Sequence, residues 1–279
     1  MLTLTFTKIF YFLFACMIFL STFFSQASAG QFLDVRFLNV GYGDSILIRS
    51  PDNSYAMIDA GDASASQRLR EELSGSGVKE IGTAIITHPH ENHYQGFQEL
   101  VQSLPINQWF INREKEAPPE YTQWQQMLEK QGIEFFLLSK GDTVPALSEG
   151  IKIEVLHPSA LGPDINDNSL VLWLTYGNTA FLFTSDIGEK YQEKLIADYP
   201  FIKKADCVQL PHHGGPLSER FINFFDHAVF IMSTGPNSFG IPGSADIQKL
   251  KGKKYFRTDR DGIIFLKSDG EIVGVISSQ

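Results

Sequence analysis

The chain has 279 residues, and its 32 acidic and 23 basic side chains give a formal net charge of −9. With 43% hydrophobic and 13% aromatic residues, the composition is typical of a folded globular protein and excludes a disordered, collagen-like or coiled-coil chain. The sequence has no basic run. This argues against a dedicated duplex DNA or RNA binder, because phosphate affinity comes mainly from clustered Lys and Arg.

The N-terminal segment 1–29 predicts an export signal. Lys8 is its only charged side chain, and an apolar run from residue 9 to residue 20 follows. Ala27 and Ala29 place small side chains at the two positions that a signal peptidase reads. We therefore expect cleavage between Ala29 and Gly30 and an extracytoplasmic mature protein, either periplasmic or secreted. The alternative is an uncleaved membrane anchor, for which the apolar run is short.

Cleavage would leave residues 30–279, with a net charge of −10 because Lys8 is removed. One cysteine, Cys207, stays in this part, so no internal disulfide is expected, and its apolar neighbours predict a buried structural thiol. No second apolar stretch is long enough to cross a bilayer, so we expect no stable membrane insertion after cleavage. No repeat or linker divides residues 30–279, which we interpret as one domain without an assigned oligomeric state.

Short runs rich in Val, Ile and Phe predict strands, with amphipathic segments between them. Strands are expected at residues 32–38, 44–48, 55–58, 83–87, 108–111, 134–138, 151–156, 169–175, 180–183, 207–210, 228–232, 255–257, 263–266 and 272–276. Helices are expected at residues 66–73, 93–104, 120–131, 189–197, 218–225 and 245–250. Many strands arrive in pairs before a helix intervenes. The pattern predicts an α/β fold of two mixed sheets packed face to face with helices outside, a four-layer αββα sandwich.

Three of the seven histidines fall within six residues, between His88 and His93, directly after the predicted strand 83–87. Side chains two residues apart in an extended stretch point the same way, so His88 and His90 can offer two imidazoles to one metal ion. If the chain then turns into a helix, Asn92 and His93 lie in its first turn and face the same cavity. The spacing predicts a metal site, and the alternative is a surface loop that happens to contain histidines.

The segment from His88 to His93 resembles the H-x-H-x-D-H signature of the metallo-β-lactamase superfamily. Further segments resemble, in the same order, the lactamase-like domain of ComEC-type competence proteins: residues 37–45, 58–61, 156–158, 168–172, 184–186, 210–215 and 255–262. The resemblance implies an αββα sandwich with a metal site at one edge of its two sheets. It also implies a metal-dependent hydrolase of phosphodiesters or related phosphate esters, with a small-molecule or nucleic-acid substrate.

The resemblance assigns His88, His90 and His157 to a first metal ion and Asp186 to a position shared between two ions. For His157 the alternative is an ordinary hydrogen-bonded histidine at a strand end. For Asp186 the alternative is a cap on the following helix. Three histidines and a carboxylate suit Zn²⁺, with Mn²⁺ as the other candidate.

The resemblance also gives roles to three residues that are not expected to bind the metal ion. Asp59 is expected to orient a ligand histidine by hydrogen bonding, and the alternative is a plain turn aspartate. His212 or His213 is expected to face the substrate as a proton donor or phosphate contact. The pattern leaves both histidines open as candidates for that role.

Two departures from the family pattern weaken the second metal position. Asn92 replaces the aspartate of the signature, and its uncharged carbonyl oxygen binds a divalent ion less well than a carboxylate. Ile241 stands where ComEC-like domains tend to have a histidine. His93 and Asp186 are then the obvious ligands left at this position, so we expect one ion per chain. The competing hypothesis is a degenerate, non-catalytic lactamase fold that acts as a binding module.

Overall fold

The computed structural model describes residues 32–145 and 147–277, and the expected signal peptide with its cleavage site lies outside them. The larger sheet has eight strands, which pair in the order β15 (Val273–Ser277), β14 (Ile264–Ser268), β1 (Leu33–Phe37), β2 (Ser45–Arg49), β3 (Tyr55–Ala60), β4 (Ile81–Ile86), β5 (Ile106–Asn112) and β6 (Phe135–Leu138). The smaller sheet has seven, in the order β13 (Tyr255–Arg257), β12 (Val229–Met232), β11 (Cys207–Gln209), β10 (Thr179–Phe183), β9 (Val171–Tyr176), β8 (Ile151–His157) and β7 (Thr143–Val144).

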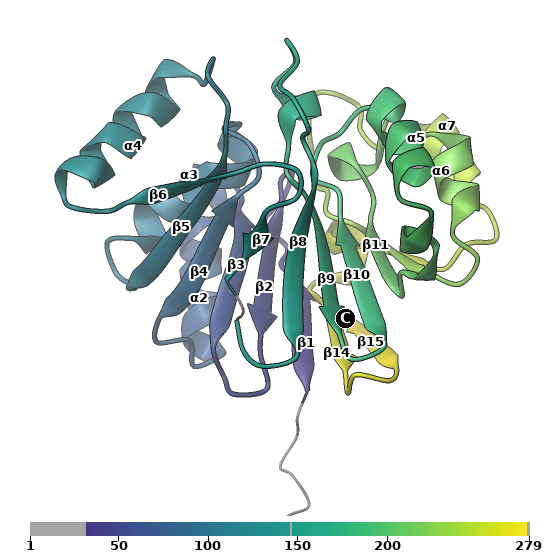
Figure 1. Ribbon diagram of the computed structural model, residues 1–279, viewed down its shortest axis with the longest axis horizontal. Coiled ribbons are helices and arrows are strands. Elements are labelled where there is room, and N and C mark those ends of the chain that lie inside the picture. The colour runs from purple at the N-terminus through teal and green to yellow at the C-terminus, as the bar shows by residue number, and fades with distance from the viewer. Residues whose placement is uncertain (1–31, 146, 278–279) are drawn as a thin grey trace, which may run out of the picture. The chain divides into compact units, whose positions relative to one another are not determined.

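Helices cover the outer face of each sheet (Figure 1). The larger sheet carries α2 (Ser66–Gly75), α3 (Glu91–Leu100) and α4 (Pro119–Lys130). The smaller sheet carries α5 (Glu189–Asp198), α6 (Glu219–Phe224) and α7 (Ser244–Lys249). The remaining helical segments are short: η1 (Ala63–Ala65), η2 (Asn166–Asn168), η3 (Pro200–Lys204), η4 (His212–Gly214) and α8 (Thr258–Asp261). The predicted αββα sandwich is confirmed. The sequence analysis did not predict β7 and α8, because these elements are too short to show a periodicity.

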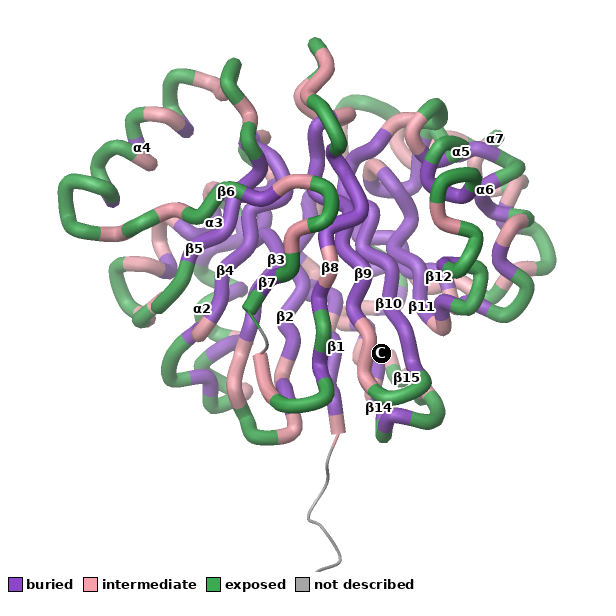
Figure 2. The backbone as a smooth tube through the Cα atoms, viewed as in Figure 1, coloured by how far each residue is buried: buried purple, intermediate pink, exposed green. Residues whose placement is uncertain are grey.

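Alternation of side chains along the central strands builds three apolar layers. In β3, Ile58 packs into the layer between the sheets and Met57 packs under the helices of the larger sheet. In β10, Phe181 and Phe183 face the layer between the sheets while Leu182 faces the helices of the smaller sheet. Because both faces of these strands are buried, their sequences read as continuous apolar runs (Figure 2).

The parallel parts of the two sheets bring the predicted site residues to one edge. Strands β3 to β6 run parallel, and so do β10 to β13. Ligands of α/β proteins bind beyond the carboxyl ends of such strands. Thr87, just after β4, accepts a 2.7 Å hydrogen bond from Ser185, just after β10. This bond joins the two sheets at the edge where the loops with the histidines begin.

Cys207 is buried in β11 with its side chain in the layer between the sheets, which confirms its prediction as a structural thiol. Burial raises the pKa of this thiol far above its ordinary value, so the group stays protonated. Across the described residues, no helix combines the length and the apolar character that crossing a bilayer requires.

Gly96 allows α3 to lie directly on β3. A Cβ atom at this position would come within 2.0 Å of the carbonyl oxygen of Ala60. We expect Gly96→Ala to lower the free energy of unfolding by about 1–3 kcal/mol, because the helix must move away from the strand. Chemical denaturation measures this effect. Gly75→Ala in α2 is the matched control, since a Cβ there has no neighbour within 4 Å, and equal stability of the two variants would contradict the close packing.

Candidate metal centre

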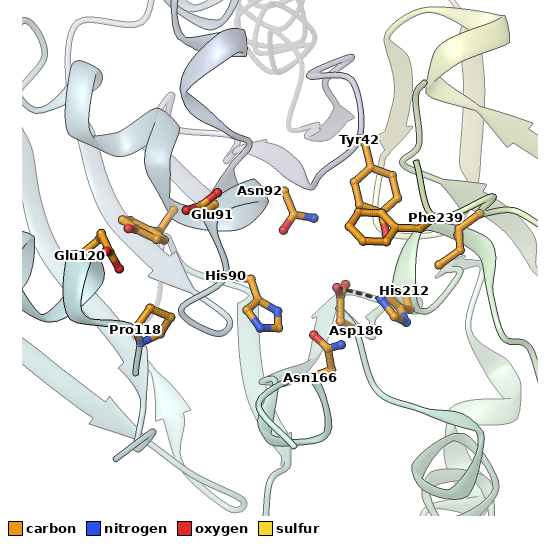
Figure 3. A pocket seen from close by; sticks show the side chains of 12 residues that line it. Tyr42, His90, Glu91, Asn92, Pro118, Glu120, Asn166, Asp186, His212 and Phe239 are labelled. Atoms are coloured by element: carbon orange, nitrogen blue, oxygen red, sulfur yellow. Dashed lines mark ion pairs between the residues drawn. The ribbon is translucent and has the colours of Figure 1, made fainter. Parts of the chain in front are cut away.

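Eight of the nine predicted site residues come from the ends of four strands, and the ninth, His157, ends β8. His88 and His90 follow β4, and Asn92 and His93 lie in the first turn of α3. Asp186 follows β10, His212 and His213 follow β11, and Asp59 lies near the end of β3. Figure 3 shows His90, Asn92, Asp186 and His212 around one cavity.

His88, His93 and Asp186 form the centre of the cluster. His93 Nε2 lies 3.3 Å from Asp186 Oδ2, and His88 Nε2 lies 3.8 Å from the same oxygen. Their ligand atoms all lie within 4.8 Å of one another. His90 joins them, because its Nδ1 lies 3.0 Å from His88 Nε2. The structure thus brings together four of the residues that the sequence assigned to metal binding.

Asp59 holds His93 in its orientation. Its carboxylate accepts hydrogen bonds from the Thr87 backbone amide at 2.8 Å and from the Thr87 hydroxyl at 2.7 Å. One of its oxygens also lies 2.8 Å from His93 Nδ1. A proton on Nδ1 completes this bond and leaves a lone pair on Nε2, which faces Asp186. This is the kind of contact expected for Asp59, and the carboxylate does more than support a turn.

Backbone strain concentrates at this edge of the sheets. Four non-glycine residues of the site edge adopt positive φ angles: Asp59 at 55°, Ser185 at 47°, His212 at 49° and His213 at 56°. Each such conformation costs about 1–3 kcal/mol, and it persists where the surrounding structure compensates for it. Gln209 gives part of this support, because its Oε1 accepts hydrogen bonds from the Thr184 and Ser185 amides at 3.1 and 3.3 Å.

Asp186 is not the cap of the following helix. Helix α5 begins after Gly188, whose amide donates a hydrogen bond to Asp167 at 3.0 Å. Asp186 instead turns its Oδ2 toward the imidazoles of the cluster. The helix-cap alternative for Asp186 therefore does not describe this structure.

His212 and His213 differ in their surroundings. His213 is buried, with Nδ1 3.0 Å from the Ser233 carbonyl oxygen and Nε2 2.9 Å from Asn92 Nδ2. Since Nδ1 donates to the carbonyl, Nε2 accepts from the Asn92 amide. The side chain of His212 is 23% exposed and lines the cavity, with Nε2 3.8 Å from Asp186 Oδ2. Of the two histidines, His212 is therefore the one that faces the cavity.

His157 lies apart from the cluster, contrary to its assignment as a ligand. Its Nε2 is 2.7 Å from the carbonyl oxygen of Asp167, and its ring packs against Tyr191 of α5 at 4.8 Å between centroids. The pairing of β8 with β9 shifts register between Val155 and His157, so the strand alternation that would predict its direction is interrupted. The alternative of a hydrogen-bonded histidine at a strand end matches this placement.

Asp44 is the residue that the sequence prediction missed. It is 2% exposed, and its oxygens lie 3.8 Å from His93 Nδ1 and 3.8 Å from His213 Nδ1. Burial raises the pKa of Asp44 to about 6, although His213 and His93 act in the opposite direction. An acidic residue at the start of a fully apolar strand was the available signal, because such a side chain is rarely buried without a partner.

Opposing electrostatic effects set the charge of the cluster. Burial alone would lower the pKa of His93, but the carboxylates of Asp186 and Asp59 outweigh it and raise that pKa well above its ordinary value. Burial would raise the pKa of Asp186, but His213 and His93 hold it well below the usual range. For His88, burial dominates and lowers its pKa well below the ordinary value. Asp186 is therefore anionic and His88 is a neutral imidazole, whereas His93 carries on Nε2 a proton that a bound cation would displace.

The donor atoms fit a metal ion. Within the described part of the chain, His93 Nε2, Asp186 Oδ1 and both carboxylate oxygens of Asp44 are buried without a hydrogen-bond partner. Each unsatisfied polar group of this kind costs about 1–3 kcal/mol. Divalent cations bound among these groups would satisfy them, and a set of imidazole and carboxylate donors suits zinc, manganese or iron. The groups able to hold an ion overlap: His88 with His93 and Asp186, Asp44 with Asp59 and His93, and Asp44 with Asp186 and His213.

Comparison with known proteins agrees with this geometry. Residues 38–220 match the family model of the metallo-beta-lactamase superfamily. The chain is 25% identical over 254 residues to ComE operon protein 3 of Bacillus subtilis (strain 168), covering 83% of this chain and 32% of that protein. It is 26% identical over 233 residues to Competence protein ComA of Neisseria gonorrhoeae, covering 81% of this chain and 31% of that protein. The chain thus spans about a third of the length of these curated relatives.

Two solved structures share the fold at 11% sequence identity. CmlA of Streptomyces venezuelae, described as a diiron beta-hydroxylase, has a TM-score of 0.52 over 88% of this chain and 54% of its own. Tm1679, described as a metal-dependent hydrolase of the beta-lactamase superfamily, has a TM-score of 0.53 over 88% of this chain and 100% of its own. Taken with the family match over residues 38–220, these findings show that the chain belongs to the metallo-β-lactamase superfamily and is similar to the lactamase-like part of ComEC-type competence proteins.

Proposed function

We propose that this protein is an exported metal-dependent hydrolase of phosphodiesters or related phosphate esters. The observation that supports hydrolysis best is the convergence of His88, His93 and Asp186 beside a cavity of about 510 Å³. The superfamily consists mostly of metallo-hydrolases, which agrees with this chemistry. The choice of phosphate esters rests on the similarity to ComEC-type domains.

The residues of the cluster would have different roles in hydrolysis. His88, His93 and Asp186 would hold a divalent ion, which would supply Lewis-acid stabilisation of the ester and lower the pKa of the attacking water. Asp59 is a positioning residue, since it fixes the ring of His93 through Nδ1. His212 faces the cavity from the side opposite His90, where it can contact a phosphoryl oxygen or the leaving group (Figure 3).

His88→Ala tests the metal centre, with His157→Gln as the matched control. We expect the first variant to lose its metal ion and at least about a hundredfold of its turnover, because it removes a converging imidazole. The second variant should keep its metal ion and its turnover, since His157 lies apart from the cluster with its Nε2 at the Asp167 carbonyl. Elemental analysis of chelator-free protein and hydrolysis of bis(p-nitrophenyl) phosphate measure the two effects. Unchanged metal content in His88→Ala would refute the assignment.

Asn92→Asp tests the non-catalytic alternative. The Asn92 amide occupies His213 Nε2 at 2.9 Å, which favours a centre with one ion or a fold that only binds. A carboxylate at this position adds a charged donor, so we expect the metal content to rise from about one to about two ions per chain and turnover to rise about tenfold or more. Asn92→Ala removes the amide without adding charge. If both variants have the same metal content and rate, the added charge has no role.

The proposed export rests on the sequence of residues 1–29. Expression of the full chain in a bacterial host with a secretion pathway should give a mature protein that begins at Gly30, because small residues precede that bond. N-terminal sequencing and intact mass identify the product. Ala29→Phe should block cleavage, since a bulky side chain does not fit the peptidase site. Recovery of uncleaved wild-type protein would count against export by this route.

A further inference from the structure

We infer that the cavity beside the metal centre contains a subsite for a planar aromatic group of a low-molecular-weight ester, formed by Tyr42, Phe239 and Ile241. The inference deepens the proposed function and rests on it where the aromatic group is taken as part of the substrate. Three observations support it: the exposure of the Phe239 ring, the hydrogen bonds that hold its loop, and the absence of lysine and arginine from the described residues that line the cavity.

Phe239 is 71% exposed, which is unusual for a phenylalanine in a well-packed protein. Its ring lies 5.4 Å from the ring of Tyr42 at an interplanar angle of 33°. Tyr42 in turn packs on His213, with 4.4 Å between ring centroids. Figure 3 shows the two aromatic rings together beside Asp186. The exposed ring therefore continues a row of tilted ring contacts that runs from His213 through Tyr42 to Phe239.

The loop that carries Phe239 is held in place by the side chain of Asn237. The amide nitrogen of Asn237 donates to the carbonyl oxygens of Gly235 at 2.9 Å and Ile241 at 2.5 Å. Its amide oxygen accepts from the backbone amides of Phe239 at 3.0 Å and Ile241 at 3.3 Å. One side chain thus satisfies four backbone groups of an exposed turn. The backbone that carries the ring is therefore ordered before a ligand binds, which reduces the entropy cost of binding.

The base of this loop is also fixed against the turn that carries Tyr42. A Cβ atom on Gly235 would lie 2.5 Å from the carbonyl carbon of Gly41 and 2.8 Å from the amide nitrogen of Tyr42. The two turns therefore touch backbone to backbone. Their contact sets the spacing of the two rings, although one turn precedes β2 and the other follows β12.

The charges of the cavity select against a polyanion. Glu91 and Glu120 lie on the side away from the aromatic rings (Figure 3), and the described residues that line the cavity include no lysine or arginine. A nucleic-acid strand needs clustered cations to hold its phosphates. Ile241, at the place of a histidine in ComEC-like domains, makes the wall near the rings apolar. A cavity of about 510 Å³ suits a small ester with an uncharged ring.

Binding of phenylphosphonate and methylphosphonate to the zinc-loaded mature protein tests the subsite by calorimetry, without any turnover. We expect phenylphosphonate to bind at least about fivefold more tightly, the lower range for stacking of one ring on an aromatic side chain. Phe239→Ala should remove this preference, and Phe239→Trp should retain it. Equal affinities in the wild type, no binding of phenylphosphonate, or an unchanged preference in Phe239→Ala would each overturn the inference.

The outcomes separate this inference from the proposed function. A phenyl preference that depends on Phe239, with no hydrolysis of any phosphate ester, would retain the subsite and refute the hydrolase. Hydrolysis of bis(p-nitrophenyl) phosphate without a phenyl preference would support the hydrolase and refute the subsite.

The acidic wall is tested with a single-stranded 12-mer oligonucleotide. We expect wild-type protein to bind it more weakly than phenylphosphonate, and the double variant Glu91→Gln/Glu120→Gln to bind it at least about tenfold more tightly than the wild type. Glu134→Gln/Glu149→Gln removes the same charge from exposed positions that do not line the cavity, and it should leave binding unchanged. Tight, salt-sensitive binding of the oligonucleotide by the wild type would overturn the restriction to small esters.

Discussion

Three buried carboxylates, those of Asp44, Asp59 and Asp186, impose the constraint around which this end of the molecule is built. An ionised carboxylate that leaves water needs charged or hydrogen-bonding partners, or it costs several kcal/mol. Asp59 has such partners in Thr87 and His93. Asp186 has imidazoles on several sides, whereas Asp44 has no hydrogen bond from its described neighbours. The negative charge left over is what a bound cation would neutralise.

The four-layer sandwich makes this concentration of charge possible. Strands buried on both faces are rigid enough to hold Asp59, Ser185, His212 and His213 in positive φ conformations at their carboxyl ends. The bond between Ser185 and Thr87 then ties the two sheets together where the cluster forms. Stability of the apolar layers and geometry of the site are therefore linked, because the energy of packing offsets the strain and the desolvation at the edge.

The two departures from the family pattern act in different places. Asn92 donates a hydrogen bond to His213. The position therefore makes a contact within the protein, where the aspartate of the family signature would offer a charged ligand to a metal ion. Ile241 lies on the cavity wall near Phe239, and the Asn237 side chain binds its backbone. The first departure reduces the charge available to a second ion, and the second makes the wall apolar. In the function that we propose, both favour a small, uncharged ring beside a single ion over a polyanionic strand.

The architecture and the centre of the candidate site could be predicted from the amino-acid sequence, because both depend on short-range patterns. Apolar runs bounded by turns mark strands wherever both faces are buried, and three histidines within six residues mark a metal site at a strand-to-helix junction. Which distant residues join these histidines depends on how the whole chain packs. Near a register shift in β8, the side chain of His157 points away from the cluster and bonds to the Asp167 carbonyl. The packing of the two sheets buries Asp44 beside His93. The fold also leaves His212 partly exposed and buries His213, since neighbouring residues in a strained turn face different surroundings that no local pattern encodes.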